Sequence, residues 1–518
     1  MIQRGWQLIK NGWQQLHGPL ARWWLLGFIL ALVVKVLGLQ VGGWLSLMGL
    51  LLLSCWLPLV AAKSNRQRWT WRQFGLVWTL MMGTGIWWLP LGWGGYLATL
   101  QVSIKLPATL QNIIFNTRYD WLPIVVPLWG LSWLVSLKWL PALRQQLQQP
   151  TNWSTYWRTG WHTSWWSVVK RGGNWLVVLA GWAVIASVAL GVVWMAELVA
   201  PMLGYGLAVL SLTGLQLLIW LALMGLWREW WPNVTSSRTN HHNYWSSSLL
   251  LIGLLTYAGW WLQPSTAALP AVIAHRGVNG DNGVQNTTKT LKRTAGRVHP
   301  NMVEMDIQAT ADHRWVVMHD PTLQNLADRP GPVRDYSLSQ LAGLPLQEHG
   351  QRGQLSTFSQ YFQVAQRIRQ PLLVEIKAVG VADQLMGPFA DRYAKQLQQH
   401  QGAVHSLDYR VVARLHQRDP QLRVGFITPF YLTDFKLSVA NFYSLQALTA
   451  TQEQVNAAHR EHRKVYFWTV DRSLAMRRLT AMGADGLITN YPGRLRQIQS
   501  QQSHYFFNQL INWLVSGL

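Results

Sequence analysis

The first half of the chain consists of long apolar segments with very few acidic residues. Of the 518 residues, 1–267 hold 17 of the 44 Lys and Arg but only three of the 21 Asp and Glu. A helix needs about 20 apolar residues to cross a bilayer core of ~30 Å. Seven segments meet this need: 23–40, 42–62, 74–99, 121–140, 175–200, 205–227 and 246–264. Residues 1–264 are therefore predicted to form a polytopic, α-helical membrane domain.

The basic residues of this half are concentrated in particular loops. They gather in the N-terminal tail and in the stretches 63–73, 141–174 and 228–245. Because cytoplasmic loops carry the excess of Lys and Arg, the N-terminus is expected inside, and seven crossings leave residue 265 onward extracellular. The net charge of +23 would suit binding to nucleic acid. The basic residues of the first half lie in short loops between apolar runs, however, as in a membrane protein, so no nucleic-acid partner is expected.

The second half has the composition of a soluble domain. After a linker at 265–270, helical stretches alternate with short β-rich runs at 271–275, 302–307, 315–319, 372–377, 403–406, 422–427, 464–470 and 486–489. Eight such strands predict an α/β fold, a (β/α)₈ TIM barrel over residues 271–500. The tail 501–518 is too short for a clear span and is predicted to be an amphipathic or interfacial segment.

Acidic side chains lie at the ends of two of these strands. Glu304 and Asp306 are two residues apart on one strand, so both project to the same face, and Glu375 lies near the end of another. Carboxylates that converge repel one another unless a cation lies between them. The only cysteine, Cys55, lies in an apolar run, so three oxygen ligands favour Mg²⁺ or Ca²⁺ over zinc. Alternatively, the acids pair with Arg and Lys in a structural network.

Two histidines and two basic residues lie at the same strand ends. His275 and Arg276 end the first strand, His319 ends the third, and Lys377 ends the fourth. Phosphodiester cleavage needs one group that accepts a proton and another that donates one, and histidine suits both roles. Arg276 can bind a phosphate oxygen through two hydrogen bonds. Lys377 could instead form a salt bridge with Glu375.

Seven short motifs follow one another in this half: His275-Arg276-Gly277, Gln285-Asn286-Thr287, Glu304-Met305-Asp306, His319-Asp320, Glu375-Ile376-Lys377, Phe467-Trp468-Thr469-Val470 and Gly483-Ala484-Asp485-Gly486-Leu487-Ile488-Thr489. In order and spacing they resemble the motifs of the glycerophosphodiester phosphodiesterase family. The resemblance covers about 271–497, and the first half is similar to the membrane domain of a bacterial branch of that family. It implies a TIM barrel with a small insertion around 320–370, in a multi-pass protein of the bacterial cell membrane.

The resemblance also implies a role for each polar residue. The acid/base pair would be His275 and His319; the ligands of a divalent cation, Ca²⁺ or Mg²⁺, would be Glu304, Asp306 and Glu375; Arg276 and Lys377 would contact the phosphate; and Trp468 would line the glycerol pocket. Trp468 could equally be a packed core aromatic. The products would be glycerol 3-phosphate and an alcohol, formed either through a cyclic phosphate or by direct attack of water.

Two positions depart from the family pattern. The family usually has Glu where this chain has Gln285, beside Asn286, which could alter hydrogen bonds around the metal ligands. The usual Asp after the final Ile-Thr pair is Asn490 here. Neither departure removes a histidine or a predicted ligand, so an active enzyme is expected.

Other functions fit the same pattern. A membrane-anchored barrel could act on phospholipids or on a glycerophosphate polymer such as lipoteichoic acid. It could also be a phospholipase D-like hydrolase of lysolipids, which releases the headgroup alcohol rather than glycerol phosphate. A catalytically decayed binding or sensor protein is the non-enzymatic alternative. The membrane half shows no transport signature.

Overall fold

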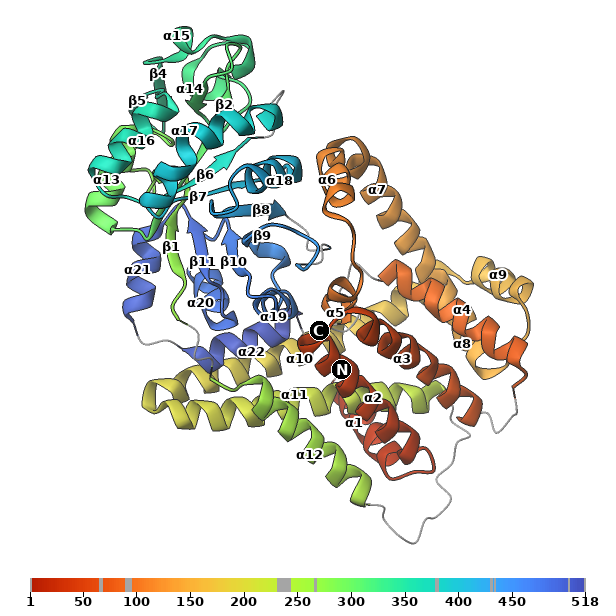
Figure 1. Ribbon diagram of the computed structural model, residues 1–518. Helices are drawn as coiled ribbons and strands as arrows, with labels where there is room; N and C mark the ends of the chain where they lie inside the picture. Colours follow the sequence, from red (N-terminus) through yellow and green to blue (C-terminus); the bar gives the residue numbers. More distant parts are fainter. Residues whose placement is uncertain are drawn as a thin grey trace. The chain divides into compact units, whose positions relative to one another are not determined.

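The computed structural model describes residues 2–64, 69–88, 96–230, 244–264, 268–377, 382–428, 432, 435–501 and 504–516. The chain forms two compact units (Figure 1). One unit contains residues 1–104, 118–264 and 504–518, and the other contains 105–117 and 265–503. The second unit therefore takes a short segment from the first half of the sequence, and the first unit takes the C-terminal tail.

The first unit is entirely helical in its described residues. Its helices are α1 (Ile2–Leu16), α2 (Ala21–Gln40), α3 (Gly43–Ser64), α4 (Trp71–Trp88), α5 (Tyr96–Ser103), α7 (Arg118–Ser136), α8 (Leu140–Gln148), α9 (Trp153–His162), α10 (Trp165–Val199), α11 (Pro201–Trp230), α12 (Tyr244–Trp261) and α22 (Tyr505–Ser516).

Five helical stretches of the described residues are long and apolar enough to cross a membrane: Ala21–Gln40, Gly43–Ser64, Arg118–Gln148, Val178–Val199 and Pro201–Glu229. The predicted spans at 74–99 and 246–264 correspond to α4 and α12, which are not among the five; residues 89–95 lie outside the described part of the chain. The helical, apolar character of this unit is as predicted. The number of crossings stays a prediction.

The C-terminal helix α22 is bound to the other helices of the first unit through a buried acid. Glu197 on α10 accepts hydrogen bonds from the backbone N–H groups of Phe506 and Phe507, at 2.8 and 3.0 Å. A carboxylate at a helix N-terminus satisfies unpaired donors and complements the helix dipole. Leu510 and Trp513 pack in the same apolar cluster as residues of α10, α11 and α12. One of the three acids of the first half thus has a structural role.

The second unit is a closed barrel. Its strands are β1 (Ala271–Ala274), β2 (Met302–Ala309), β6 (Leu372–Ile376), β7 (Ala403–Ser406), β8 (Val424–Thr428), β9 (Phe442–Gln446), β10 (Lys464–Trp468) and β11 (Gly486–Thr489). Neighbouring strands in this order are parallel, β1 pairs with β11, and the additional pairing of β1 with β2 closes the ring. The predicted (β/α)₈ architecture is confirmed.

Two of the strands differ from the sequence prediction. The run at 315–319 was counted as a barrel strand, but β3 (Trp315–Val317) pairs antiparallel with β2 and forms a hairpin beside the barrel. The eighth barrel strand is β9, which was not predicted. The predicted count of eight barrel strands was therefore correct only because one wrongly included strand offset one missed strand.

The barrel helices are α13 (Thr288–Val298), α16 (Phe358–Arg367), α17 (Met386–Gln399), α18 (Tyr409–Arg418), α19 (Gln452–Arg460), α20 (Ser473–Met482) and α21 (Pro492–Ser500). Between β3 and α16 the chain forms α14 (Gln324–Ala327), α15 (Leu338–Leu341) and the hairpin β4 (Pro345–Glu348) and β5 (Gln351–Gln354). The predicted insertion region thus contains a small subdomain followed by a barrel helix.

The segment that the barrel unit takes from the first half is α6 (Ala108–Asn116). It packs against α18. The buried side chain of Gln111 donates a hydrogen bond to Thr428 and accepts one from the backbone N–H of Leu432, and the N–H of Leu106 donates to the carbonyl of Leu432. Thr428 is the last residue of β8, so α6 is attached at the end of the barrel where strands terminate.

A glycine in β8 makes room for an aromatic ring. A Cβ at Gly425 would overlap the ring of Phe442 on the neighbouring strand. We expect Gly425→Ala to destabilise the barrel by about 1–3 kcal/mol because the buried ring must move. Gly387→Ala in α17 is the matched control, since nothing lies within 4 Å of its Cβ position. Calorimetry of the purified full-length variants should show a lowered Tm for Gly425→Ala alone; equal Tm values would contradict the packing.

Candidate active site

In seven of the eight barrel strands, the inward-facing side changes from an apolar residue to one with a polar group within two positions. Near the N-terminal ends of the strands, Ile273, Met302, Leu373, Ala403, Phe442, Tyr466 and Ile488 form an apolar cluster. Residues two apart on a strand share a face, so the next inward-facing layer is His275, Glu304, Glu375, His405, Ser444, Trp468 and Asn490. The polar layer lies at the C-terminal ends of the strands, where TIM barrels carry their chemistry.

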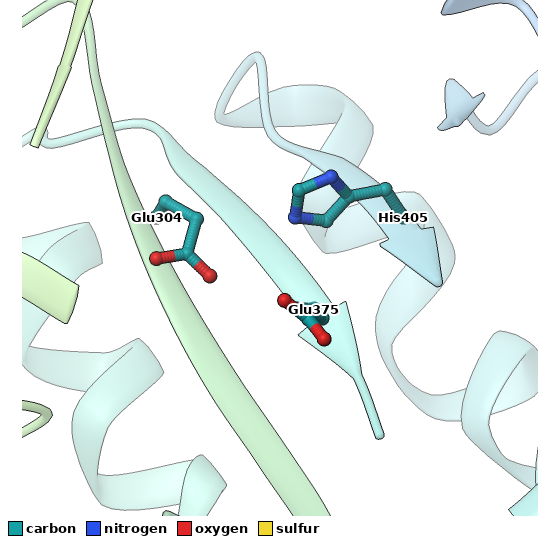
Figure 2. Close-up of side chains that lie close together, drawn as sticks. All are labelled: Glu304, Glu375 and His405. Carbon is teal, nitrogen blue, oxygen red and sulfur yellow. The ribbon is translucent and has the colours of Figure 1, made fainter. Parts of the chain in front are cut away.

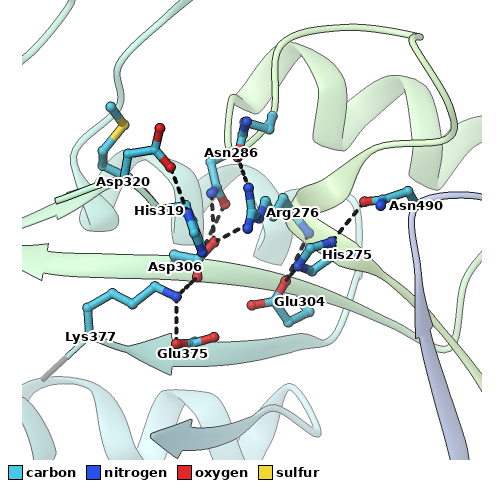
Figure 3. Close-up of polar contacts among 12 residues, drawn as sticks. His275, Arg276, Asn286, Glu304, Asp306, His319, Asp320, Glu375, Lys377 and Asn490 are labelled. Carbon is cyan, nitrogen blue, oxygen red and sulfur yellow. Dashed lines mark hydrogen bonds and ion pairs between the residues drawn. The ribbon is translucent and has the colours of Figure 1, made fainter. Parts of the chain in front are cut away.

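The predicted carboxylates lie together and have different partners (Figure 3). Glu304 accepts a hydrogen bond from the backbone N–H of Arg276 at 2.9 Å, and its other oxygen, Oε1, is buried without a hydrogen-bond partner. Asp306 lies 2.8 Å from Lys377 Nζ and accepts a hydrogen bond from Asn286 Nδ2, also at 2.8 Å. Glu375 accepts a hydrogen bond from Lys377 Nζ at 2.6 Å. Lys377 therefore bridges two of the three acids.

Burial and mutual repulsion shift the pKa values of the three acids in different directions. Burial raises the pKa of Glu304 well above its ordinary value, and the charges of Asp306 and Glu375 add to the shift. Burial also raises the pKa of Glu375, which Lys377 only partly offsets. At Asp306 burial acts the same way, but Lys377 and other cationic neighbours outweigh it and lower the pKa. Nearby positive charge thus outweighs burial at Asp306, but it does not offset burial and mutual repulsion at Glu304 and Glu375.

The residues present fit a divalent cation. Glu304, Glu375 and His405 each offer a ligand atom, and these atoms lie within 4.8 Å of one another (Figure 2). The unpartnered oxygen of Glu304 and the raised pKa values of both glutamates are what an uncompensated cation site would show. The three-residue cluster includes two of the three predicted ligands. Asp306 lies beside it, with its carboxylate held by Lys377 and Asn286.

The two predicted catalytic histidines are oriented by different groups. His275 Nδ1 lies 2.8 Å from Asn490 Oδ1, and Asn490 Nδ2 in turn donates to Asp471 at 2.8 Å. His319 Nδ1 lies 2.8 Å from a carboxylate oxygen of Asp320. Because both partners accept, each ring carries its proton on Nδ1 and leaves Nε2 for chemistry. Burial, followed by the charge of Arg276, lowers the pKa of His275 to about 4, and burial also lowers that of His319.

The hairpin of β3 explains how His319 reaches the barrel mouth without belonging to a barrel strand. Gln308 on β2 is buried, and its Nε2 lies 3.0, 3.1 and 2.7 Å from the carbonyl oxygens of Met318, His319 and Asp320. A single amide thereby fixes the backbone that follows β3. Gln308 was not predicted from the sequence, because an isolated glutamine on a strand carries no motif.

The comparisons with known proteins agree with this geometry. Residues 275–494 match the model of the glycerophosphoryl diester phosphodiesterase family. The barrel belongs to this family. A glycerophosphodiester phosphodiesterase of Caldanaerobacter subterraneus subsp. tengcongensis is 26% identical over 236 residues, which are 43% of this chain and 95% of the relative. One of Bacillus altitudinis is 24% identical over 253 residues, 44% of this chain and 98% of the relative.

A solved structure is also similar. The phosphodiesterase of Oleispira antarctica in complex with sn-glycerol-3-phosphate covers 45% of this chain and 98% of its own, with 21% identity and a TM-score of 0.40. Over nearly the whole length of the barrel the chain is therefore similar to glycerophosphodiester phosphodiesterases, as the motifs predicted.

The first departure from the glycerophosphodiester phosphodiesterase pattern is compensated by another residue. Arg276 donates to Gln285 Oε1 at 2.7 Å, and Gln285 Nε2 donates to Glu348 at 2.5 Å. Glu348 also accepts the backbone N–H of Gln285 at 2.8 Å. The carboxylate that the family usually has at position 285 is thus replaced by an amide backed by a carboxylate from β4. The sequence could not reveal this pair, because its members are 63 residues apart.

The guanidinium of Arg276 is positioned by an unusual backbone turn. Arg276 and Gly277 follow β1 with φ angles of 50° and 71°. A left-handed conformation is costly for a residue other than glycine, and such residues cluster at functional sites. Here the left-handed conformation directs the backbone N–H of Arg276 to Glu304, while the Arg276 side chain reaches Gln285.

Two members of the polar layer were not predicted from the sequence. His405 and Ser444 lie on β7 and β9 and belong to none of the seven motifs. The alternation of side chains along a strand could have identified them, because each stands two residues after an apolar, inward-facing position. For β7, Ala403 and His405 are such a pair. For β9 the signal was lost with the strand itself.

The pair Gln285 and Glu348 gives a charge-placement test. Gln285→Glu alone should lower Tm and activity, since two carboxylates would lie in hydrogen-bonding distance and repel each other. Adding Glu348→Gln moves the charge back to the family's position and should restore both. Thermal unfolding and hydrolysis assays of the two single variants and the double variant would show this coupling. Additive effects would mean that the two side chains act independently.

Proposed function

We propose that the barrel hydrolyses glycerophosphodiesters in a divalent-cation-dependent reaction at the membrane surface, giving glycerol 3-phosphate and an alcohol. One observation carries the proposal. Two histidines with differently charged partners lie around a buried carboxylate cluster that retains excess negative charge. Phosphodiester cleavage needs a base, an acid and positive charge at phosphorus, and the site offers the means for all three.

We assign the phosphate contacts to Arg276 and Lys377. Both side chains lie beside Asp306, with Lys377 Nζ at 2.8 Å and Arg276 Nε at 3.8 Å from its oxygens. Asp306 thus holds two cationic groups on one side of the pocket. A bound cation at Glu304, Asp306 and Glu375 would neutralise further charge on the phosphate. Trp468, half-buried and fixed by a hydrogen bond from its Nε1 to the Ser444 carbonyl, would line the glycerol pocket.

The partners of the two histidines suggest separate roles. The Asp320 carboxylate opposes the burial that lowers the pKa of His319 and so favours its imidazolium form, which suits the acid that protonates the leaving oxygen. Asn490 is neutral, and its hydrogen bond does not offset the burial that lowers the pKa of His275, which suits the base that accepts a proton at Nε2. The nucleophile is the glycerol 2-hydroxyl, forming a cyclic phosphate that water opens, or water itself. In both routes one proton leaves the nucleophile and one reaches the leaving alcohol.

The decisive assay measures glycerol 3-phosphate released from glycerophosphocholine and glycerophosphoglycerol by the purified full-length protein. We expect metal-dependent release that EDTA stops and that His275→Ala and Glu304→Ala reduce by at least about 10³-fold, as loss of a catalytic group does. Release of choline instead would identify a phospholipase D-like reaction. Metal binding without any product, from water-soluble or lipid substrates, would identify a binding protein.

Action at the membrane surface is supported by α6. This helix is attached to the barrel at the end of β8, and it exposes Leu110, Ile113 and Ile114. The chain continues within two residues into Arg118–Gln148, one of the candidate spans. A helix with an exposed apolar face so close to a span is suited to lie in the bilayer interface. With seven crossings and the N-terminus inside, the barrel would act outside the bacterial cell membrane.

Variants of α6 should separate chemistry from membrane action. We expect the double variant Leu110→Ser/Ile113→Ser to hydrolyse glycerophosphocholine at the wild-type rate, because neither residue touches the polar layer. Hydrolysis of phosphatidylglycerol in vesicles should fall by about tenfold, since each removed side chain weakens interfacial binding. Thr109→Ser, at an exposed position on the same helix, is the control. Equal rates on vesicles for all three proteins would exclude this role of α6.

A further inference from the structure

His405 is a buried histidine that the proposed acid–base chemistry does not use. It lies on β7 with 2% of its surface exposed. In the parallel register it stands beside Glu375 on β6, so both side chains enter the barrel interior at the same level. Figure 2 shows its ring directed toward the two carboxylates of Glu304 and Glu375. An imidazole at this place has to satisfy its nitrogens within the site.

The two ring nitrogens of His405 have different surroundings. Nδ1 lies 3.0 Å from Ser444 Oγ. Nε2 is buried and has no hydrogen-bond partner. Buried polar atoms nearly always have a partner, and a missing one indicates an ion or water that completes the site. When Nδ1–H donates to Ser444, Nε2 carries a lone pair directed at the carboxylate cluster, as metal-bound histidines are commonly arranged.

An ion pair between His405 and the glutamates does not explain the arrangement. Among the described residues, no carboxylate oxygen comes within 4.0 Å of the His405 ring nitrogens. Two carboxylates, one of them with an unpartnered oxygen, therefore share the site with an imidazole nitrogen that forms an ion pair with neither. A cation between them would serve all three groups.

We propose that His405 Nε2 is a ligand of the catalytic cation, together with Glu304 and Glu375, and that this nitrogen makes the site prefer Zn²⁺ over Ca²⁺. The role rests on the metal dependence proposed above. Two atoms bound to one ion at ~2.1 Å are at most about 4.2 Å apart, so the ligands, which lie within 4.8 Å of one another, need only small side-chain rotations. Glu375 gives one oxygen to Lys377 and keeps the other for the ion.

The nitrogen decides the choice of metal. Ca²⁺ and Mg²⁺ bind almost exclusively oxygen, whereas imidazole is a preferred ligand of Zn²⁺ and similar ions. Three oxygen ligands, as predicted from the sequence, would favour Ca²⁺ or Mg²⁺. One imidazole and two carboxylates form a three-ligand set with an open position, which resembles catalytic zinc sites. Asp306 lies beside this set, and its carboxylate also holds Lys377.

The test measures metal binding without substrate. Metal-free full-length protein in detergent is titrated with Zn²⁺ and with Ca²⁺ by calorimetry, and with Co²⁺ by visible absorption, since Co²⁺ reports its ligands spectroscopically. We expect wild-type protein to bind Zn²⁺ more tightly. His405→Gln retains a polar group of similar size but removes the nitrogen, and it should lower Zn²⁺ affinity by about 100-fold or more. Its Ca²⁺ affinity should change by less than about threefold, because Ca²⁺ accepts an amide oxygen.

Matched variants keep the result interpretable. His313→Asn removes an exposed histidine from the turn between β2 and β3 and should leave both affinities and the Co²⁺ spectrum unchanged. Glu304→Gln should weaken both metals. Tighter binding of Ca²⁺ by wild type, or unchanged Zn²⁺ affinity in His405→Gln, would overturn the assignment, as would an equal loss of both metals with a lowered Tm. If binding behaves as expected but no diester is cleaved, the ligand role stands and the proposed function fails.

Discussion

The barrel mouth is organised by negative charge that water does not solvate. Glu304, Asp306 and Glu375 converge above an apolar cluster, and ionised carboxylates so placed need positive charge or hydrogen bonds nearby. The chain supplies these unevenly. Asp306 has Lys377 and Asn286, whereas Glu304 has one backbone N–H and an unpartnered oxygen. The histidines, the arginine turn and the amide partners are all arranged around this imbalance.

Much of the site could be predicted because its residues lie at strand ends in local motifs. Parallel strands bring their C-terminal ends to one rim, so His275, Glu304 and Glu375 had to meet once the barrel was assumed. His319 was predicted for a partly wrong reason. Its strand is the outer member of a hairpin, and Gln308 rather than the barrel positions it.

What could not be predicted depends on partners distant in the sequence. β9 is a short strand interrupted by Ser444, and its membership in the barrel follows from pairing with β8 and β10. The replacement of a family carboxylate by Gln285 and Glu348 is likewise a tertiary feature. His405 belongs to no motif, and its relation to the glutamates depends on the register between β6 and β7.

The division of the chain into units has a consequence for proteolysis. The barrel's sequence begins after α12 and ends before α22, and both of these helices belong to the helical unit. The last helix is held there by the capping contact of Glu197. A protease that cuts once between α12 and β1 would therefore not release the barrel, since its other end continues into α22. Release requires two cuts, and even then the barrel would stay bound noncovalently to α6, which lies between α5 and α7 in the chain.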